Sequence, residues 1–261
     1  MTTTALDLRR PVGRAVLGAL AHVGRLSLML YEMARGLLEW RVWLPRTFTE
    51  AWNIGVGSLF IVLLVAGFAG AVTALQTGYQ FTGSIPYYVA GSLVVESVVL
   101  ELGPVLTGLV LSGRIGARYA AELGTMRVTE QIDALETLGR SPASHLVIPR
   151  VLAGIVMIPI LTVFANVMGV ASGWLAVQQV LPVTDADFIY GARVFWHPFD
   201  AWYSIIKGFA FATCITIVSC YFGFSTEQGA EGVGKSTTGA VVASCVMILL
   251  LDTVLAKLLL H

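Results

Sequence analysis

The chain has 261 residues, of which 56% are hydrophobic and only 12% are charged, and its mean hydropathy is +0.80. Soluble domains carry about 25% charged residues, and half that share cannot cover the surface of a globule of this size. The composition therefore excludes an ordinary soluble domain and predicts that most of the surface faces lipid or other subunits. The net charge is zero, so the placement of the charges is more informative than their sum.

Residues 12–40 have the pattern of an amphipathic helix. At 100° per residue, Leu20, Val23 and Leu30 fall in one sector, and Arg25 and Arg35 fall in the opposite one. Arginines beside an apolar stripe are typical of a helix in the cytoplasmic membrane interface; a helix packed against a soluble cap is the alternative. We expect residues 1–50 to form a cytoplasmic interfacial region and residues 51–261 to form the transmembrane domain.

Five apolar runs follow, and each reaches the length of about 20 residues that a helix needs to cross a bilayer. The third run is longer than one crossing needs, so we expect it to tilt or to continue beyond the membrane. The sequence therefore predicts an all-α polytopic membrane protein with five spans. The runs lie at residues 54–75, 85–111, 151–184, 201–224 and 239–260.

The arginines set the expected orientation of these spans. Seven precede the first run, and five more lie between the second run and the third. The positive-inside rule places both regions in the cytoplasm. The N-terminus is therefore expected in the cytoplasm, and five spans place the C-terminus on the outer side.

The second run contains two carboxylates, Glu96 and Glu101. A charged side chain at mid-bilayer costs about 2.5–3.5 kcal/mol on insertion scales and normally faces a bundle interior or a wet cavity. Gly103 and Pro104 follow, and the proline predicts a bend or break. These carboxylates are candidates for a substrate path, with a structural hydrogen bond as the alternative, and Asp252 in the last run is a weaker candidate.

The cytoplasmic loop between the second and third runs contains a short amphipathic pattern. Val128, Ile132 and Leu135 recur at helical spacing, and Gly139 is well placed to end the helix. We expect a short helix within residues 115–140 that lies across the cytoplasmic side. Its acidic face predicts either a docking element or a solvated loop helix.

Residues 229–236, GAEGVGKS, match the P-loop pattern. That motif needs a strand before the loop and a nucleotide-binding sheet around it, whereas here the end of a span precedes it. We interpret the segment as a flexible cytoplasmic turn before the last span, with Lys235 at the lipid headgroups. The histidines are scattered, and no nucleophile, base and orienting group converge. We therefore expect no catalytic residue, no metal and no cofactor.

Two stretches carry a family resemblance. Residues 101–117 read ELGPVLTGLVLSGRIGA, and residues 121–139 read AELGTMRVTEQIDALETLG. Both resemble the signature of the MlaE/YrbE permeases, the membrane subunits of MCE-type ABC transporters that move phospholipids and related lipids between membranes. The resemblance extends more weakly over most of the chain, including residues 229–238, which form a permease loop in that family.

The resemblance implies an assembly and a location. It implies an inner-membrane homodimer with a periplasmic C-terminus, two copies of a separate ATPase subunit that binds the ATP, and a periplasmic MCE-domain protein. The permease itself would perform no chemistry and would bind lipids rather than nucleic acid.

The resemblance also implies two sets of site residues. Glu101 would lie near a lipid pocket at the dimer interface, with Gln76 as a neighbour and with Glu96 and Leu100 as further substrate-binding candidates. A coupling helix within residues 122–139 would dock on the ATPase. Its candidate residues are Glu122, Arg127, Glu130, Gln131, Asp133, Glu136 and Gly139.

One position departs from the family pattern. In well-known phospholipid-transporting members an arginine precedes the equivalent of Glu101, whereas this chain has Leu100. A headgroup contact by an Arg–Glu pair is therefore not expected here.

Two alternative functions would use the same carboxylates, Glu96 and Glu101. An ion-coupled secondary transporter would show inverted repeats, into which five spans divide badly, and a membrane-embedded lipid-modifying enzyme would need a catalytic set.

Overall fold

The computed structural model describes residues 9–81, 86–227 and 229–260, and every regular element in those ranges is helical. Segments written η are π-helical turns, in which the helix is locally wider than an α-helix. In chain order the elements are α1 (Arg9–Gly36), α2 (Trp40–Gln80), α3 (Val89–Glu96), η1 (Ser97–Leu102), α4 (Gly103–Leu111), η2 (Ser112–Gly116), α5 (Ala117–Val128), α6 (Gln131–Thr137), η3 (Ala143–Val147), α7 (Ile148–Val177), α8 (Asp185–Val194), α9 (Pro198–Phe224) and α10 (Ala230–Leu259).

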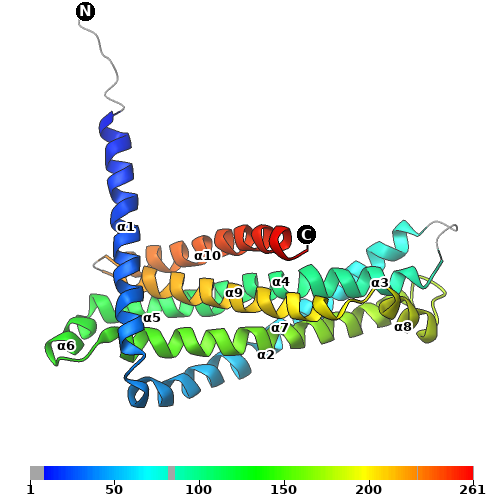
Figure 1. The fold of residues 1–261 in the computed structure, drawn as a ribbon, viewed down its shortest axis with the longest axis horizontal. Helices are drawn as coiled ribbons and strands as arrows, with labels where there is room; N and C mark the ends of the chain where they lie inside the picture. Colours follow the sequence, from blue (N-terminus) through cyan, green and yellow to red (C-terminus); the bar gives the residue numbers. More distant parts are fainter. Residues whose placement is uncertain (1–8, 82–85, 228, 261) are drawn as a thin grey trace, which may run out of the picture.

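Five helices are long and apolar enough to cross a membrane, which confirms the predicted all-α fold with five spans. The second span is a continuous run from α3 to α5, and the third joins η3 to α7. The third ends at Val177, so the remaining uncharged residues to 184 lie beyond the helix. The five spans lie side by side in one elongated bundle, with α6 at one end and α8 at the other (Figure 1).

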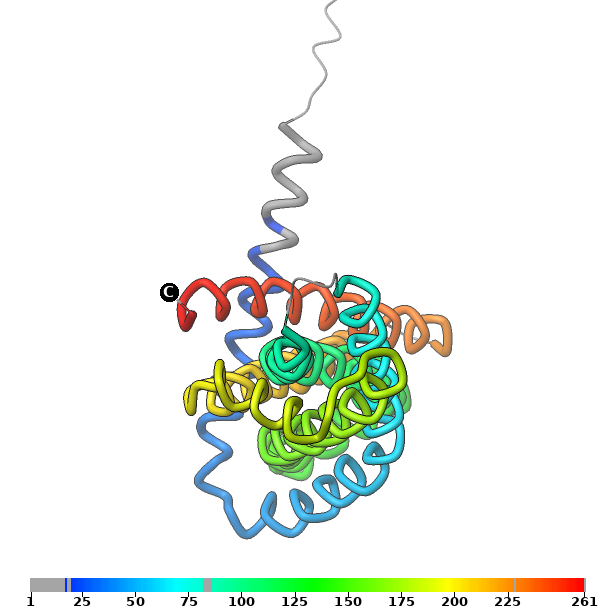
Figure 2. The backbone as a smooth tube through the Cα atoms, turned by 90° about the vertical axis from the view of Figure 1, so that its right-hand side faces the viewer, coloured from blue at the N-terminus to red at the C-terminus, as the bar shows by residue number. Residues whose placement is uncertain are grey.

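Helix α1 lies across the bundle rather than within it, and its Met29 packs with Leu123 and Val147 in a core cluster. It runs roughly at right angles to the long axis across the α6 end (Figures 1 and 2). Leu20 and Val23 are more than 60% exposed, and only Met29 among the described apolar side chains of α1 is buried. Leu26 and Met33 pack beside Met29, and the interfacial position of the exposed part of the stripe stays a prediction. The side chains of Arg14 and Val16, expected on the polar and apolar faces, lie outside the described residues.

The bundle is held by apolar packing and by small residues that let helices approach closely. Helices α2 and α7 pair over much of their length, and the Ser172 hydroxyl donates to the Gly67 carbonyl across that contact at 2.7 Å. A hydroxyl that finds a carbonyl of a neighbouring helix replaces the water that lipid cannot provide. The central core combines Val62, Leu111 and Phe211, which come from three different spans.

The second span does not break at Pro104; instead its helical turn widens just before the proline. Residues 97–102 widen into the π turn η1, and the chain continues as α4 without leaving helical geometry. In an α-helix the proline ring would collide with the carbonyl of Leu100, four residues earlier. The wider turn accommodates the ring, so the predicted break is replaced by a local π-helical insertion.

Two segments expected in the cytoplasm differ from expectation in their boundaries. The expected turn at residues 229–236 is shorter, because α10 already begins at Ala230 and a Glu231–Lys235 ion pair of 2.8 Å supports its first turns. The expected loop helix is α6, which is separated from α5 by Glu130 with a φ of 60°. As predicted, Gly139 ends it, with a φ of 70°.

Candidate functional site

The polar centre of the membrane domain is an ion cluster of Glu101, Lys207 and Asp252. The Lys207 ammonium lies 2.5 Å from Glu101 Oε2 and 2.6 Å from Asp252 Oδ1. The three residues come from η1, α9 and α10, so the cluster ties three spans together. Lys207 is completely buried, which is tolerated for a charged group only when opposite charges surround it.

Pro104 explains why Lys207 also binds the backbone. Because proline has no N–H, it cannot donate to the Leu100 carbonyl as residue 104 of an α-helix would. The Lys207 ammonium donates to that carbonyl instead, at 2.9 Å. The unpaired backbone acceptor and the cation therefore satisfy each other in a region without water.

The members of the cluster differ in their exposure. Lys207 has no exposed side-chain area and Asp252 is 13% exposed, but the Glu101 side chain is 52% exposed. The Lys207 ammonium also lies 4.7 Å from the centre of the Tyr203 ring, which adds a cation–π contact. Glu101 is thus the side of the cluster that a ligand or a second subunit can reach.

Asn166 on α7 packs against the two spans that carry Glu101 and Lys207. Its amide nitrogen donates to Ser204 Oγ at 2.8 Å, one turn before Lys207 on α9. A Cβ added at Gly103 would stand only 1.7 Å from Asn166 Oδ1. Glycine at position 103 therefore lets the amide lie directly on the backbone that carries Glu101.

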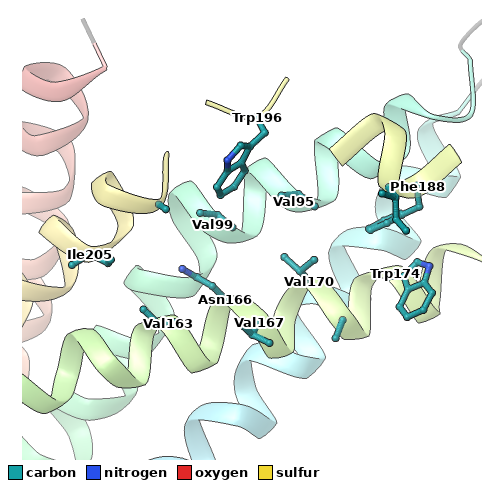
Figure 3. A pocket seen from close by; sticks show the side chains of 13 residues that line it. Val95, Val99, Val163, Asn166, Val167, Val170, Trp174, Phe188, Trp196 and Ile205 are labelled. Carbon is teal, nitrogen blue, oxygen red and sulfur yellow. The ribbon is translucent and has the colours of Figure 1, made fainter. Parts of the chain in front are cut away.

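An apolar pocket of about 590 Å³ opens between the second span, α7, α8 and α9. Figure 3 shows Asn166 with Val99 above it, Ile205 to one side and Trp174 to the other. Apart from Asn166 and the tryptophan indoles, its lining is hydrocarbon. A pocket of this composition suits an acyl chain better than a hydrophilic solute. Its lining residues are Val95, Val99, Val163, Asn166, Val167, Val170, Ala171, Trp174, Phe188, Ile189, Trp196, Ala201 and Ile205.

The other substrate-binding candidates are not brought into the cluster. Leu100 contributes its backbone carbonyl rather than its side chain. Gln76 is exposed on α2, and Glu96 is partly buried at the end of α3. Within the described ranges, no hydrogen bond or ion pair connects either side chain to Glu101.

The coupling candidates occupy the α5–α6 corner at the end of the bundle (Figure 1). The Asp133 carboxylate accepts a hydrogen bond from Arg127, so this pair links α5 to α6 across the corner. Glu130, Gln131 and Glu136 are exposed, and Gly139 takes the left-handed conformation that ends α6. Ile132 anchors the helix because it is almost fully buried.

Glu122 lies apart from that corner, in an ion network. Its two carboxylate oxygens lie 2.6 Å from Arg118 Nε and 3.1 Å from Arg150 Nη2. Glu50 on α2 joins the network through Arg118 at 3.8 Å. The network connects α2, α5 and α7 just below the α5–α6 corner.

Comparison with known proteins identifies the family. The family model described as Permease MlaE matches residues 47–258. The chain belongs to the MlaE permease family. It is 36% identical over 253 residues to a probable ABC transporter permease protein of Rickettsia felis, covering 97% of this chain and 98% of the relative. This MlaE-family protein is therefore the permease subunit of an ABC transporter and not a catalytic enzyme.

Two further relatives come from photosynthetic organisms. A probable ABC transporter permease protein of Synechocystis is 38% identical over 216 residues, covering 81% of each chain. The protein TRIGALACTOSYLDIACYLGLYCEROL 1, chloroplastic, of Arabidopsis thaliana is 35% identical over 229 residues, covering 88% of this permease and 64% of the relative.

Lys207 is the site residue that the sequence did not reveal. A lysine near the end of an apolar run reads as one that extends its ammonium to the headgroups. The one sequence signal that could have pointed to a buried donor was Pro104, because it leaves the Leu100 carbonyl without its helical hydrogen bond inside a span. In the described part of the chain, no group of three His, Cys, Asp or Glu residues could hold a metal ion.

Proposed function

We propose that this permease moves phospholipids or similar lipids between membranes, as the inner-membrane homodimer of a transporter driven by a separate ATPase. A periplasmic MCE-domain protein would receive or deliver the lipid on the outer side. The N-terminus would lie in the cytoplasm and the C-terminus in the periplasm. The observation that carries the proposal is the half-exposed Glu101, paired with the buried Lys207 inside the membrane domain.

A lipid substrate fits the chemistry of the site. An amphiphile needs one polar contact for its headgroup and apolar surface for its chains. Glu101 offers a polar contact, and the separate apolar pocket beside Asn166, which Glu101 does not line, shows that the same spans also offer hydrocarbon surface. The name of the Arabidopsis relative refers to a glycerolipid, which also favours a lipid for this permease.

A homodimer fits the exposure of the same cluster. A carboxylate that is half exposed in a span would face acyl chains if the subunit were alone, and such exposure is costly. Helix α10 flanks Glu101 through Asp252 and presents apolar side chains such as Val246, Leu250 and Val254 outward. A second copy of the chain on this face would shield Glu101 from lipid and enclose a cavity between the two protomers.

The α5–α6 corner is the proposed contact with the ATPase. It projects at the end of the bundle that the arginines assign to the cytoplasm. Glu130 and Glu136 are exposed there, while Asp133 is held by Arg127. A partner that closes on ATP would push this corner, and the corner is joined to α2 and α7 through the network around Glu122.

The test is purification of the tagged permease from its native host in mild detergent, followed by an ATPase assay. ATPase activity should co-purify with the unmodified chain and fall strongly with Glu130→Lys/Glu136→Lys. The matched control is Glu32→Lys/Glu227→Lys, which reverses two exposed cytoplasmic-side charges away from α6 and should retain the activity. If no ATPase accompanies the unmodified chain, a separate ATPase partner is ruled out under these conditions.

Transport itself needs a second assay. The purified complex in liposomes, supplied with ATP and acceptor vesicles, should transfer fluorescent phospholipid. ATP-independent transfer that follows a proton gradient would instead support the ion-coupled carrier.

A further inference from the structure

The Lys207 ammonium is enclosed by protein oxygens and is not accessible to a ligand. An ammonium has three N–H donors and no acceptor. Three oxygens lie within 2.9 Å of it, namely Glu101 Oε2, Asp252 Oδ1 and the Leu100 carbonyl. Because the side chain is completely buried, a substrate headgroup cannot reach this cation without breaking the cluster.

Unlike Lys207, the Glu101 carboxylate has an oxygen that a ligand can reach. Lys207 binds its Oε2 atom, and no hydrogen bond to its Oε1 atom is found within residues 9–81, 86–227 and 229–260. The side chain is 52% exposed. The accessible part of the cluster is therefore an acceptor-only carboxylate oxygen, with no donor beside it from the described protein.

The charge balance points the same way. Two carboxylates share one ammonium, so the cluster carries an excess of negative charge in its ionised form. A phosphate group brings only acceptors and further negative charge, and both properties oppose contact with Glu101. A primary ammonium brings a positive charge and N–H donors, and a charge-assisted hydrogen bond between the two would be strong in this apolar setting.

We propose that Glu101 selects lipids whose headgroup carries a primary ammonium, as in phosphatidylethanolamine, and disfavours headgroups that end in a bare phosphate. This inference rests on the proposed lipid-transport function and names the substrate class of the same site. Lys207 and Asp252 act indirectly. The lysine holds the Glu101 carboxylate in place and presents no donor to the ligand, and Asp252 keeps the lysine paired.

The experiment measures lipid binding to the detergent-purified permease, with whatever subunits accompany it, by native mass spectrometry. The probes are dioleoyl phosphatidylethanolamine, phosphatidylglycerol and phosphatidic acid, so that only the headgroup varies. Phosphatidylethanolamine should bind at least about tenfold more tightly than phosphatidic acid, as one charge-assisted hydrogen bond implies. Glu101→Gln keeps the shape of the side chain and should abolish this preference, whereas the control Glu32→Gln on α1 should keep it.

The possible results separate three claims: the preference for an ammonium headgroup, the role of Glu101 and the lipid substrate itself. Equal or tighter binding of phosphatidic acid or phosphatidylglycerol to the unmodified protein overturns the ammonium selectivity while leaving lipid transport intact. A preference that survives in Glu101→Gln overturns the role of Glu101. If none of the three lipids binds, the lipid substrate itself is refuted. The headgroup series on the unmodified protein needs no variant, so a misfolded Glu101→Gln would still leave the selectivity decided.

Discussion

The Lys207 ammonium lies 2.5 Å from the Glu101 carboxylate, although 106 residues separate them in the chain. Asp252 completes the contact at 2.6 Å from a third helix. Packing η1, α9 and α10 together therefore also neutralises the charge of Lys207. Neither carboxylate can lose the lysine without leaving negative charge in a low-dielectric region.

Replacing Lys207 should show this dependence directly. Lys207→Met leaves two adjacent carboxylates without a cation, and we expect the free energy of unfolding to fall by about 3–5 kcal/mol. Lys207→Met/Asp252→Asn removes one charge of each sign and should recover part of the loss. Thermal unfolding in detergent measures both effects.

Lys257→Met is the control for this pair, because Lys257 is exposed near the end of α10. It should change stability by only a few tenths of a kcal/mol. Equal losses for Lys207→Met and Lys257→Met, or additive losses in the double variant, would contradict the ion cluster.

Gly103 should tolerate no side chain. Gly103→Ala places a methyl group 1.7 Å from Asn166 Oδ1, so we expect a loss of about 1–3 kcal/mol from overpacking. Asn166→Ala in the same chain should relieve the collision and return part of that stability. The measurement is the melting temperature of each variant.

Gly113→Ala is the matched control for Gly103→Ala, since it lies in the same span with no atom within 4 Å of its added Cβ. It should be neutral. A Gly103→Ala protein as stable as Gly113→Ala would disprove the close approach of Asn166.

Arg150 should not be replaceable by lysine. Its guanidinium donates to the Leu146 carbonyl at 2.9 Å and to Glu122 Oε2 at 3.1 Å, and lies 5.4 Å from the centre of the Tyr119 ring. A lysine ammonium cannot reproduce this planar fork. We expect Arg150→Lys to lose about 2 kcal/mol by chemical denaturation.

Exposed Arg25 serves as the reference for that change, and Arg25→Lys should be neutral. If Arg150→Lys is equally neutral, the buried network does not depend on guanidinium geometry.

Glu130 stores strain at the α5–α6 corner, because its φ of 60° is unfavourable for a residue with a side chain. Glu130→Gly should therefore stabilise the corner by about 1 kcal/mol. Glu136→Gly, inside α6, should destabilise it by a similar amount, because glycine is a poor helix former. Amide hydrogen exchange of Ala134, whose N–H donates to the Glu130 carbonyl, reports both changes. Faster exchange in both variants would argue against strain at position 130.

Local patterns predicted much of this structure, and tertiary pairing explains what they missed. Apolar run length depends only on nearby residues, so all five spans and α1 could be predicted. Glu101 could be identified as unusual, since a charge inside a span is costly wherever it lies. Its partner could not, because hydropathy does not say which faces of η1, α9 and α10 meet. The same reason hid the Arg127–Asp133 and Arg150–Glu122 pairs, in which three of the expected docking residues also make contacts within the chain.

The length of α2 has a mechanical consequence. Its 41 residues follow a helical path of about 60 Å, roughly twice the hydrocarbon thickness of a bilayer. Its one interior proline, Pro45, lies close to its start, and beyond that point the helix curves around the bundle without a proline kink (Figure 2). A displacement imposed near α1 would therefore pass along one continuous helix to its far end.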